Sequence, residues 1–99
     1  MLISKPKHLK EHYALNDEVF LQITQFYNAD NSSIYKINAL LVSIKTRAFE
    51  AKFARELYPN VFLFRQGDFC AIYRVFEIDF EIIEIKRNSQ NSYNTNPTL

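Results

Sequence analysis

The apolar residues of this chain change their spacing at Val61, and this change constrains the fold most strongly. Before Val61, apolar side chains recur every three or four residues, which is typical of helices that bury one face. After it come three short runs rich in β-branched and aromatic residues, separated by brief polar turns. A chain that is helical first and β-rich afterwards predicts an α+β domain.

Two or three helices are expected in the first part of the chain. Pro6 suits the first turn of a helix from about residue 5 to 15, and Asn16 is a typical cap for a second helix. A third helix is expected after an Asn- and Ser-rich segment, with a break near Thr46 because it carries two apolar stripes on different sides. The first stripe comprises Ile34, Ile37, Leu41, Ile44 and Ala48, and the second comprises Phe49, Phe53 and Leu57.

Three antiparallel strands are expected at residues 61–65, 69–76 and 80–85. The first turn contains Gly67, the only glycine of the chain, and we expect this residue to adopt a positive φ. Near Ile83 the alternation of apolar and polar residues slips, which predicts a β-bulge. The second part of the chain is therefore predicted to be a three-stranded antiparallel meander, covered by the helices on one face.

The length of 99 residues fits one domain, which we place at residues 1–87, followed by a polar tail at 88–99. A single cysteine excludes an intramolecular disulfide. No cofactor or metal is expected, because His8 and His12 have helical spacing but no visible third ligand. The sequence shows no apolar leader and no membrane-length run, so a cytoplasmic protein without a membrane partner is expected.

The net charge of +1 excludes a general polyanion binder that works through its overall field, so any nucleic-acid contact requires a local patch. Lys45 and Lys52 would share a helix face if the helix continues, either as a phosphate-binding ridge or as an ordinary solvated face. A run of acidic residues counts against RNA binding and would suit a protein-binding surface instead. It comprises Glu77, Asp79, Glu81 and Glu84.

Residues 60–75 resemble the signature hairpin of the RelE/ParE toxin superfamily. In that family a strand ends in a Gly-Asp or Gly-Asn turn, and an aromatic residue and an aliphatic-Tyr-Arg pattern follow; here these are Gly67-Asp68, Phe69 and Ile72-Tyr73-Arg74. Residues 80–86 resemble the family's last strand, and residues 9–12 and 26–29 faintly resemble its HigB branch. The resemblance implies helices on one face of an antiparallel sheet and a shallow functional groove on the other.

Members of this superfamily cut messenger RNA on the ribosome or inhibit DNA gyrase, and an antitoxin protein holds them inactive. The resemblance thus implies the toxin of a bacterial type II toxin–antitoxin pair, with mRNA cleavage as the leading activity and the antitoxin, RNA and the ribosome as partners. Two alternatives are a non-enzymatic gyrase inhibitor and a small phage or plasmid protein that blocks a host protein. The chain departs from the RelE pattern at Val61, Leu63 and Cys70, which stand where nucleases carry basic residues.

RNA cleavage of this type requires cations around the scissile phosphate and a group that transfers a proton. The catalytic candidates left by the resemblance are Arg65, Arg74, Arg87 and Tyr93, and the candidates for RNA phosphate binding are Lys86, Lys45 and Lys52. We expect the cations of the sheet to line one concave face, and Tyr93 or a histidine of the first helix to transfer the proton. These cations are Arg65, Arg74, Lys86 and Arg87.

Nine Phe and six Tyr residues are more than a minimal core needs. We therefore expect an exposed apolar patch on the helices, where the antitoxin would bind. The residues expected to contribute are Phe20, Phe26, Tyr27, Phe49 and Phe53.

Overall fold

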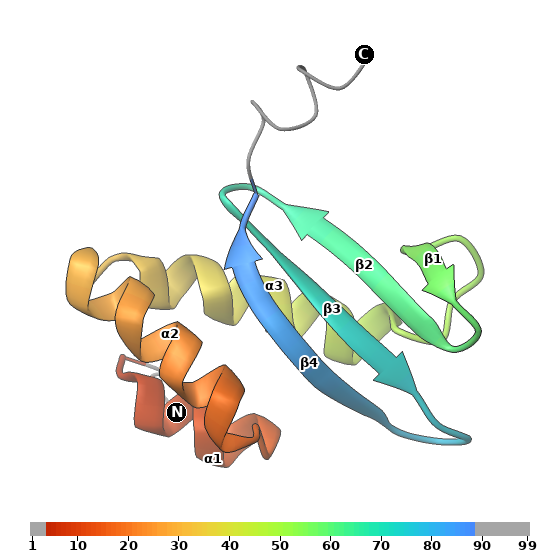
Figure 1. The fold of residues 1–99 in the computed structure, drawn as a ribbon, viewed down its shortest axis with the longest axis horizontal. Helices are drawn as coiled ribbons and strands as arrows, with labels where there is room; N and C mark the ends of the chain where they lie inside the picture. Colours follow the sequence, from red (N-terminus) through yellow and green to blue (C-terminus); the bar gives the residue numbers. More distant parts are fainter. Residues whose placement is uncertain (1–3, 89–99) are drawn as a thin grey trace.

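The computed structural model describes residues 4–88. Its elements are α1 (Pro6–Tyr13), α2 (Asp17–Ala29), α3 (Ser33–Arg47), β1 (Arg55–Tyr58), β2 (Val61–Gln66), β3 (Phe69–Val75) and β4 (Phe80–Arg87). The strands form one antiparallel sheet in the order β1-β2-β3-β4. α2 contacts β4, and α3 contacts β2 and β3, so the helices cover one face of the sheet (Figure 1). The α+β class and the order of helices before strands are confirmed.

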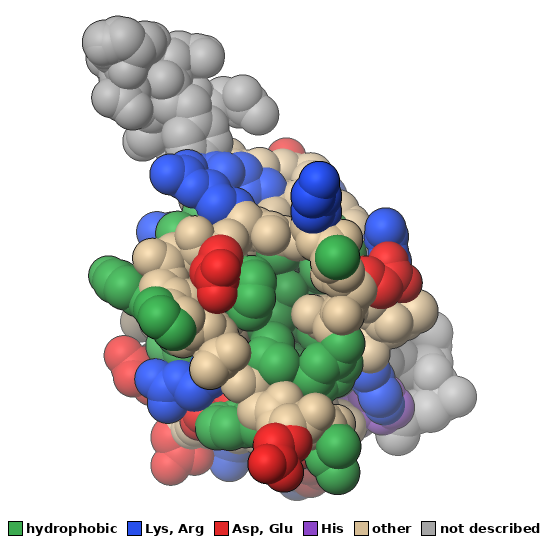
Figure 2. Space-filling model, turned by 90° about the vertical axis from the view of Figure 1, so that its right-hand side faces the viewer, with side chains coloured by type: hydrophobic (Ala, Val, Ile, Leu, Met, Phe, Trp, Pro, Cys, Tyr) green, Lys and Arg blue, Asp and Glu red, His purple; other side chains and the backbone are tan. Residues whose placement is uncertain are grey.

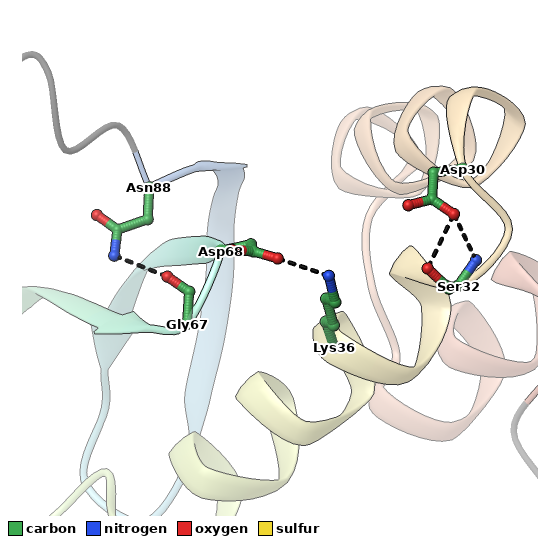
Figure 3. A network of polar contacts seen from close by, with 6 residues as sticks. All are labelled: Asp30, Ser32, Lys36, Gly67, Asp68 and Asn88. Carbon is green, nitrogen blue, oxygen red and sulfur yellow. Dashed lines mark hydrogen bonds and ion pairs between the residues drawn. The ribbon is translucent and has the colours of Figure 1, made fainter.

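A proline and polar side chains set the starts of the helices. Pro6 occupies the first turn of α1, where its missing N–H costs nothing. The Asn16 side chain caps α2 by accepting a hydrogen bond from the Val19 N–H at 2.8 Å. Before α3, the Asp30 carboxylate accepts from the Ser32 N–H at 3.0 Å and from its hydroxyl at 2.8 Å (Figure 3). These short-range contacts explain why the helices start close to the expected positions.

The core lies between the helices and the sheet. All five residues of the first apolar stripe expected from the sequence are buried; they are Ile34, Ile37, Leu41, Ile44 and Ala48. Phe69, Ala71 and Tyr73 of β3 are buried with them. Tyr73 is the largest of these, and its ring stacks on Phe62 with centroids 5.6 Å apart. This packing identifies the face of the sheet that the helices cover, and every second strand residue points away from it.

The expected second helical segment after Thr46 does not form, and this expectation is wrong. α3 ends at Arg47, Lys52 adopts a left-handed φ of 63°, and residues 55–58 form β1. The Phe53 ring stacks on Phe64 of β2 at 4.2 Å. Strand pairing and this ring contact outweigh the helix propensity of residues 50–56, so the sheet has four strands and not the expected three.

A turn signal in the sequence marks the additional strand. Pro59 is followed by Asn60, whose φ is 69°. Proline followed by a residue of positive φ is typical of a type II turn, and here the two residues join β1 to β2. Asparagine tolerates positive φ better than most residues. The Pro59-Asn60 pair therefore indicates a turn between two strands, and not only the end of a helix.

Two details expected of the sheet are confirmed. Ile72 pairs with Glu84 and Tyr73 pairs with Ile82, which leaves Ile83 as the extra residue of a bulge in β4. Gly67 adopts a φ of 62° in the β2–β3 turn.

We predict that Gly67→Val lowers the free energy of unfolding by about 1–2 kcal/mol, because a β-branched residue is strained at positive φ. A Cβ at this position meets no atom within 4 Å, so the loss comes from the backbone alone. Gly67→Asn is the matched control and should lose less, since asparagine tolerates this region. Urea unfolding measures both variants, and equal stability of the two would contradict the strain argument.

Candidate nucleic-acid interface

The outer face of the sheet, opposite the helices, carries three rows of paired residues. Directly paired residues of neighbouring strands project to the same face. The rows are Arg65, Cys70 and Lys86; Arg55, Leu63, Ile72 and Glu84; and Tyr58, Val61, Arg74 and Glu81. Leu63 and Cys70 are buried although they lie outside the helix-side core. Figure 2 views the molecule from the side on which β1 lies in Figure 1, and shows hydrophobic side chains in the middle bordered by charged ones.

A groove along β1 and β2 is lined by positively charged side chains. Its cavity volume is about 470 Å³, and it is lined by Lys52, Phe53, Ala54, Arg55, Leu63, Phe64 and Arg65. Three of these side chains are cationic, and no carboxylate of the described residues is among them. Lys86 extends this charge across the sheet, because it flanks Cys70 on the side opposite Arg65. We call Lys52, Arg55, Arg65 and Lys86 the basic band.

The structure thus brings together three predicted site residues and adds one. Lys52, Arg65 and Lys86 were candidates from the sequence, and Arg55 joins them because residues 55–58 pair as a strand. Burial raises the pKa of the Cys70 thiol, while the charges of Lys86 and Arg65 act in the opposite direction. The neutral thiol at the base of the band adds no negative charge to this part of the outer face.

Arg74 lies on the same face but outside the basic band. It pairs with Val61 and with Glu81, in the row farthest from Arg65. A cross-strand carboxylate offsets its charge. The structure therefore separates Arg74 from the other predicted cations of the outer face.

Arg87 points to the helix side, so the expectation that four cations line one face is wrong for this residue. It pairs with the core residue Phe69, and its guanidinium lies 5.0 Å from the Phe69 ring centroid and 5.4 Å from that of Phe26. Adjacent strand residues alternate between faces, which places Lys86 and Arg87 on opposite sides. The cation–π geometry favours a packing role for Arg87.

The β2–β3 turn is tied to α3 rather than to the arginines of the sheet. Lys36 and Asp68 form an ion pair at 2.6 Å, and the Asn88 amide donates to the Gly67 carbonyl at 3.1 Å (Figure 3). The hydrogen bond and the charge of Lys36 lower the pKa of Asp68. Asp68 is thus directed towards α3, away from the outer face.

The other predicted site residues do not join the band. Lys45 lies at the end of α3 with Nζ 5.8 Å from the Tyr13 ring, and because the helix ends at Arg47, Lys45 and Lys52 share no helix face. His12 lines a cleft on the helix side together with Lys45. A histidine of α1 is therefore placed on the wrong side of the sheet for proton transfer at the band. Tyr93 lies outside the described residues.

Glu84 is a titratable side chain of the outer face that, from the sequence, belongs to an acidic run expected to count against RNA binding. It lies two residues before Lys86 on β4 and on the same face. Its alternation with Lys86 is a signal in the sequence that would have identified it. Within residues 4–88, no group of three or more His, Cys, Asp or Glu side chains is arranged to hold a metal ion.

Three exposed apolar side chains lie on α3 and just beyond its end: Tyr35 and Val42 belong to the helix, and Phe49 lies two residues after Arg47. Tyr35, Val42 and Phe49 are spaced seven residues apart and are 57%, 46% and 52% exposed. We call these three residues the α3 stripe. Among the aromatic residues expected in an exposed patch on the helices, Phe49 is exposed. The other four are half-buried; they are Phe20, Phe26, Tyr27 and Phe53.

Comparisons of this chain with protein-family models, with curated proteins and with solved structures find no match. Among the helices of residues 4–88, none has the length and apolar character needed to span a membrane.

Proposed function

We propose that this protein is the toxin of a toxin–antitoxin pair of the RelE/ParE type and that it cleaves messenger RNA bound on the basic band. The observation that supports this most is the groove with Lys52, Arg55 and Arg65, which Lys86 extends across the sheet. In a chain of net charge +1, such a concentration of cations is a local patch of the kind that RNA binding requires. The order of three helices and an antiparallel sheet agrees with the sequence resemblance.

In the proposed reaction, the ribose 2′-OH attacks the adjacent phosphate. Glu84 accepts the hydroxyl proton, since a guanidinium is not a base near neutral pH. Arg65 and Lys86 stabilise the additional negative charge on the phosphate oxygens. The bond to the 5′-oxygen then breaks, a 2′,3′-cyclic phosphate forms, and Tyr93 donates its proton to the leaving oxygen; exchange with water then removes the proton from Glu84 and restores the one on Tyr93. Lys52 and Arg55 hold the neighbouring phosphates.

Inducible expression in a bacterial host tests the proposed function. Growth arrest accompanied by cleaved transcripts is the expected result. Arrest with DNA damage and intact transcripts would instead support gyrase inhibition. Normal growth of cells that contain folded protein would overturn the toxin assignment.

One observation favours the non-enzymatic alternative. Ile78, at the β3–β4 turn, is 92% exposed, and Phe76 beside it is also exposed. Glu77 and Asp79 flank Ile78, which makes this turn an apolar projection with acidic neighbours. Such a projection is typical of a contact with a basic protein surface. Ile78→Asp should abolish growth arrest in that case, and should leave it unchanged if the basic band carries the activity.

The antitoxin is proposed to cover the α3 stripe. We predict that Val42→Asp and Phe49→Asp leave the free energy of unfolding within about 0.5 kcal/mol, since both side chains are exposed. The same variants should lose neutralisation when toxin and antitoxin are expressed together. Leu21→Asp is the control, because Leu21 is equally exposed but lies on α2. Full neutralisation of both stripe variants would place the antitoxin elsewhere.

A further inference from the structure

The turn between β3 and β4 presents an apolar side chain between two acidic ones. Ile78 lies in this turn and is 92% exposed, and Phe76 is about half exposed. Glu77 and Asp79 stand on either side of Ile78 in the chain, and both are exposed. Apolar side chains left open to water in this way mark a contact with another protein surface. We call Phe76, Glu77, Ile78 and Asp79 the β3–β4 knob.

Hydrogen bonds set the shape of the β3–β4 knob. The Phe76 N–H donates to the Asp79 carbonyl at 2.7 Å, which closes the turn. The Asp79 carboxylate accepts from the Phe80 N–H at 2.8 Å. The Val75 N–H donates to the Asn60 carbonyl at 2.8 Å and joins the base of the turn to the β1–β2 turn. Because the knob is ordered before it binds, it loses little conformational entropy on binding.

The groove along β1 and β2 has the opposite charge and an apolar lining. Phe53, Leu63 and Phe64 supply apolar side chains, and Lys52 and Arg55 are among its cations. The Phe53 and Phe64 rings stack with centroids 4.2 Å apart. The volume of about 470 Å³ lies within the roughly 300–1,000 Å³ typical of sites that enclose a ligand. The groove is therefore large enough for the apolar side chains of one turn.

Charged side chains of the knob and of the groove stay outside the ion pairs formed within residues 4–88. Lys52 and Arg55 take part in none of these pairs. Glu77 and Asp79 take part in none of them either. Opposite potentials on two surfaces steer their association and fix their relative orientation. The knob and the groove are thus complementary both in charge and in apolar character.

The knob of one molecule cannot enter the groove of the same molecule. Val61, the first residue of β2, pairs with Arg74, so residues 76–79 lie beyond this end of β2. The groove extends in the other direction, as far as Arg65, which pairs with Cys70. Figure 1 shows the β3–β4 turn at the end of the sheet opposite the β2–β3 turn. A contact between knob and groove therefore joins two molecules.

We propose that the β3–β4 knob of one molecule binds in the groove of a second copy of this chain. Ile78 packs on the apolar lining of the groove, and the two carboxylates of the knob meet the cations beside it. The two surfaces differ, so the contact is heterologous, and a pair of molecules keeps one knob and one groove open to further copies. Because each contact involves a single turn, it is smaller than a standard interface and weak.

This contact goes beyond the proposed function and does not depend on it. The groove belongs to the basic band, so a bound second copy excludes RNA from Lys52 and Arg55. At the low protein concentrations of the growth assay the weak contact is not populated, and the chain acts as a monomer. Self-association is measured without RNA, so its failure and the failure of the toxin assignment are separate results.

Sedimentation velocity of the purified full chain, at concentrations up to about 1 mM because the contact is weak, tests the inference. We expect the average mass to rise with concentration beyond that of a dimer, and to fall at high salt because salt screens exposed charges. Ile78→Ser and Arg55→Glu should each weaken self-association by about tenfold or more. Leu21→Ser and Lys7→Glu are the matched controls, because they alter exposed residues of α2 and α1 outside both surfaces, and should associate like the original chain.

A mixture of the two defective variants tests the contact directly. Ile78→Ser keeps the groove and Arg55→Glu keeps the knob, so the mixture should form a dimer with one copy of each, and nothing larger. Each variant alone should remain monomeric at the same concentration. A mixture that stays monomeric, or an original chain of constant monomer mass, would overturn the inference. Self-association that Ile78→Ser leaves unchanged would overturn it as well, because the interface would then lie on another surface.

Discussion

Replacement of Arg65 or Lys86 by alanine is expected to lower the rate of RNA cleavage by about 10²–10³ for each variant. The two side chains flank Cys70 on the outer face, where they would share the charge that develops on the scissile phosphate. Single-turnover cleavage of a short synthetic RNA measures this effect. The double variant should also lose growth arrest in the expression assay.

Arg74→Ala and Arg87→Ala are the matched controls. Arg74 lies two rows away from Arg65, and its loss should lower the cleavage rate by no more than about tenfold, as for a phosphate contact outside the reacting centre. Arg87→Ala should leave cleavage nearly unchanged and lower stability by about 0.5–1 kcal/mol, through the lost contact with Phe26 and Phe69. If Arg74→Ala abolishes cleavage while folded Arg65→Ala and Lys86→Ala variants retain it, the basic band is not the active surface.

Tyr73→Ala is expected to lower the free energy of unfolding by about 3–5 kcal/mol, the usual cost of removing a large aromatic side chain from a core. Tyr73 is fully buried and contacts the rings of Phe62 and Phe80. Tyr73→Phe should cost almost nothing, because the hydroxyl has no hydrogen-bond partner among the described residues. Urea unfolding at neutral pH separates the two variants.

The same tyrosine is expected to make the protein sensitive to alkali. Burial raises the pKa of Tyr73 from 10.0 to about 12. Below pH 10 the side chain is neutral in both the folded and the unfolded chain. Between pH 10 and 12 the unfolded chain releases its proton first, so the free energy of unfolding falls as pH rises, by about 2–3 kcal/mol in total.

Tyr73→Phe is the control for this pH dependence, because it removes the buried phenol and keeps the ring. The other titrating groups are shared by both proteins, so the difference between their pH profiles isolates Tyr73. Urea unfolding from pH 9 to 12 should show a steeper decline for the original chain. Parallel profiles would contradict the assignment.

Local signals were sufficient for most of the secondary structure. Pro6 and Asn16 mark helix starts through backbone geometry and capping, and Gly67 marks a turn through its φ. Ile83 was identified from a slip in the alternation of apolar residues. Each of these features depends on residues only a few positions apart in the chain, which is why the sequence predicts them.

The β1 strand is the element that the helical pattern of residues 49–57 concealed, although the Pro59-Asn60 pair after it indicates a turn. Residues 50–56 have the composition of a helix, and the spacing of Phe49, Phe53 and Leu57 supports one. The decisive contact joins Phe53 to Phe64, which is remote from the helical pattern itself. Pairing with β2 and the Phe53–Phe64 ring contact both involve residues outside this helical pattern, and together they outweigh its local propensity.

For the candidate site, the sequence was enough to identify the cations, and the tertiary structure decided which of them meet. Arg55 joins the basic band because β1 pairs with β2, and Arg87 is excluded because it neighbours Lys86 on one strand. Lys45 is separated from Lys52 because α3 ends between them. The physical reason is the two-residue period of a strand: a shift of one residue in register moves a side chain to the other face, and long-range packing sets the register.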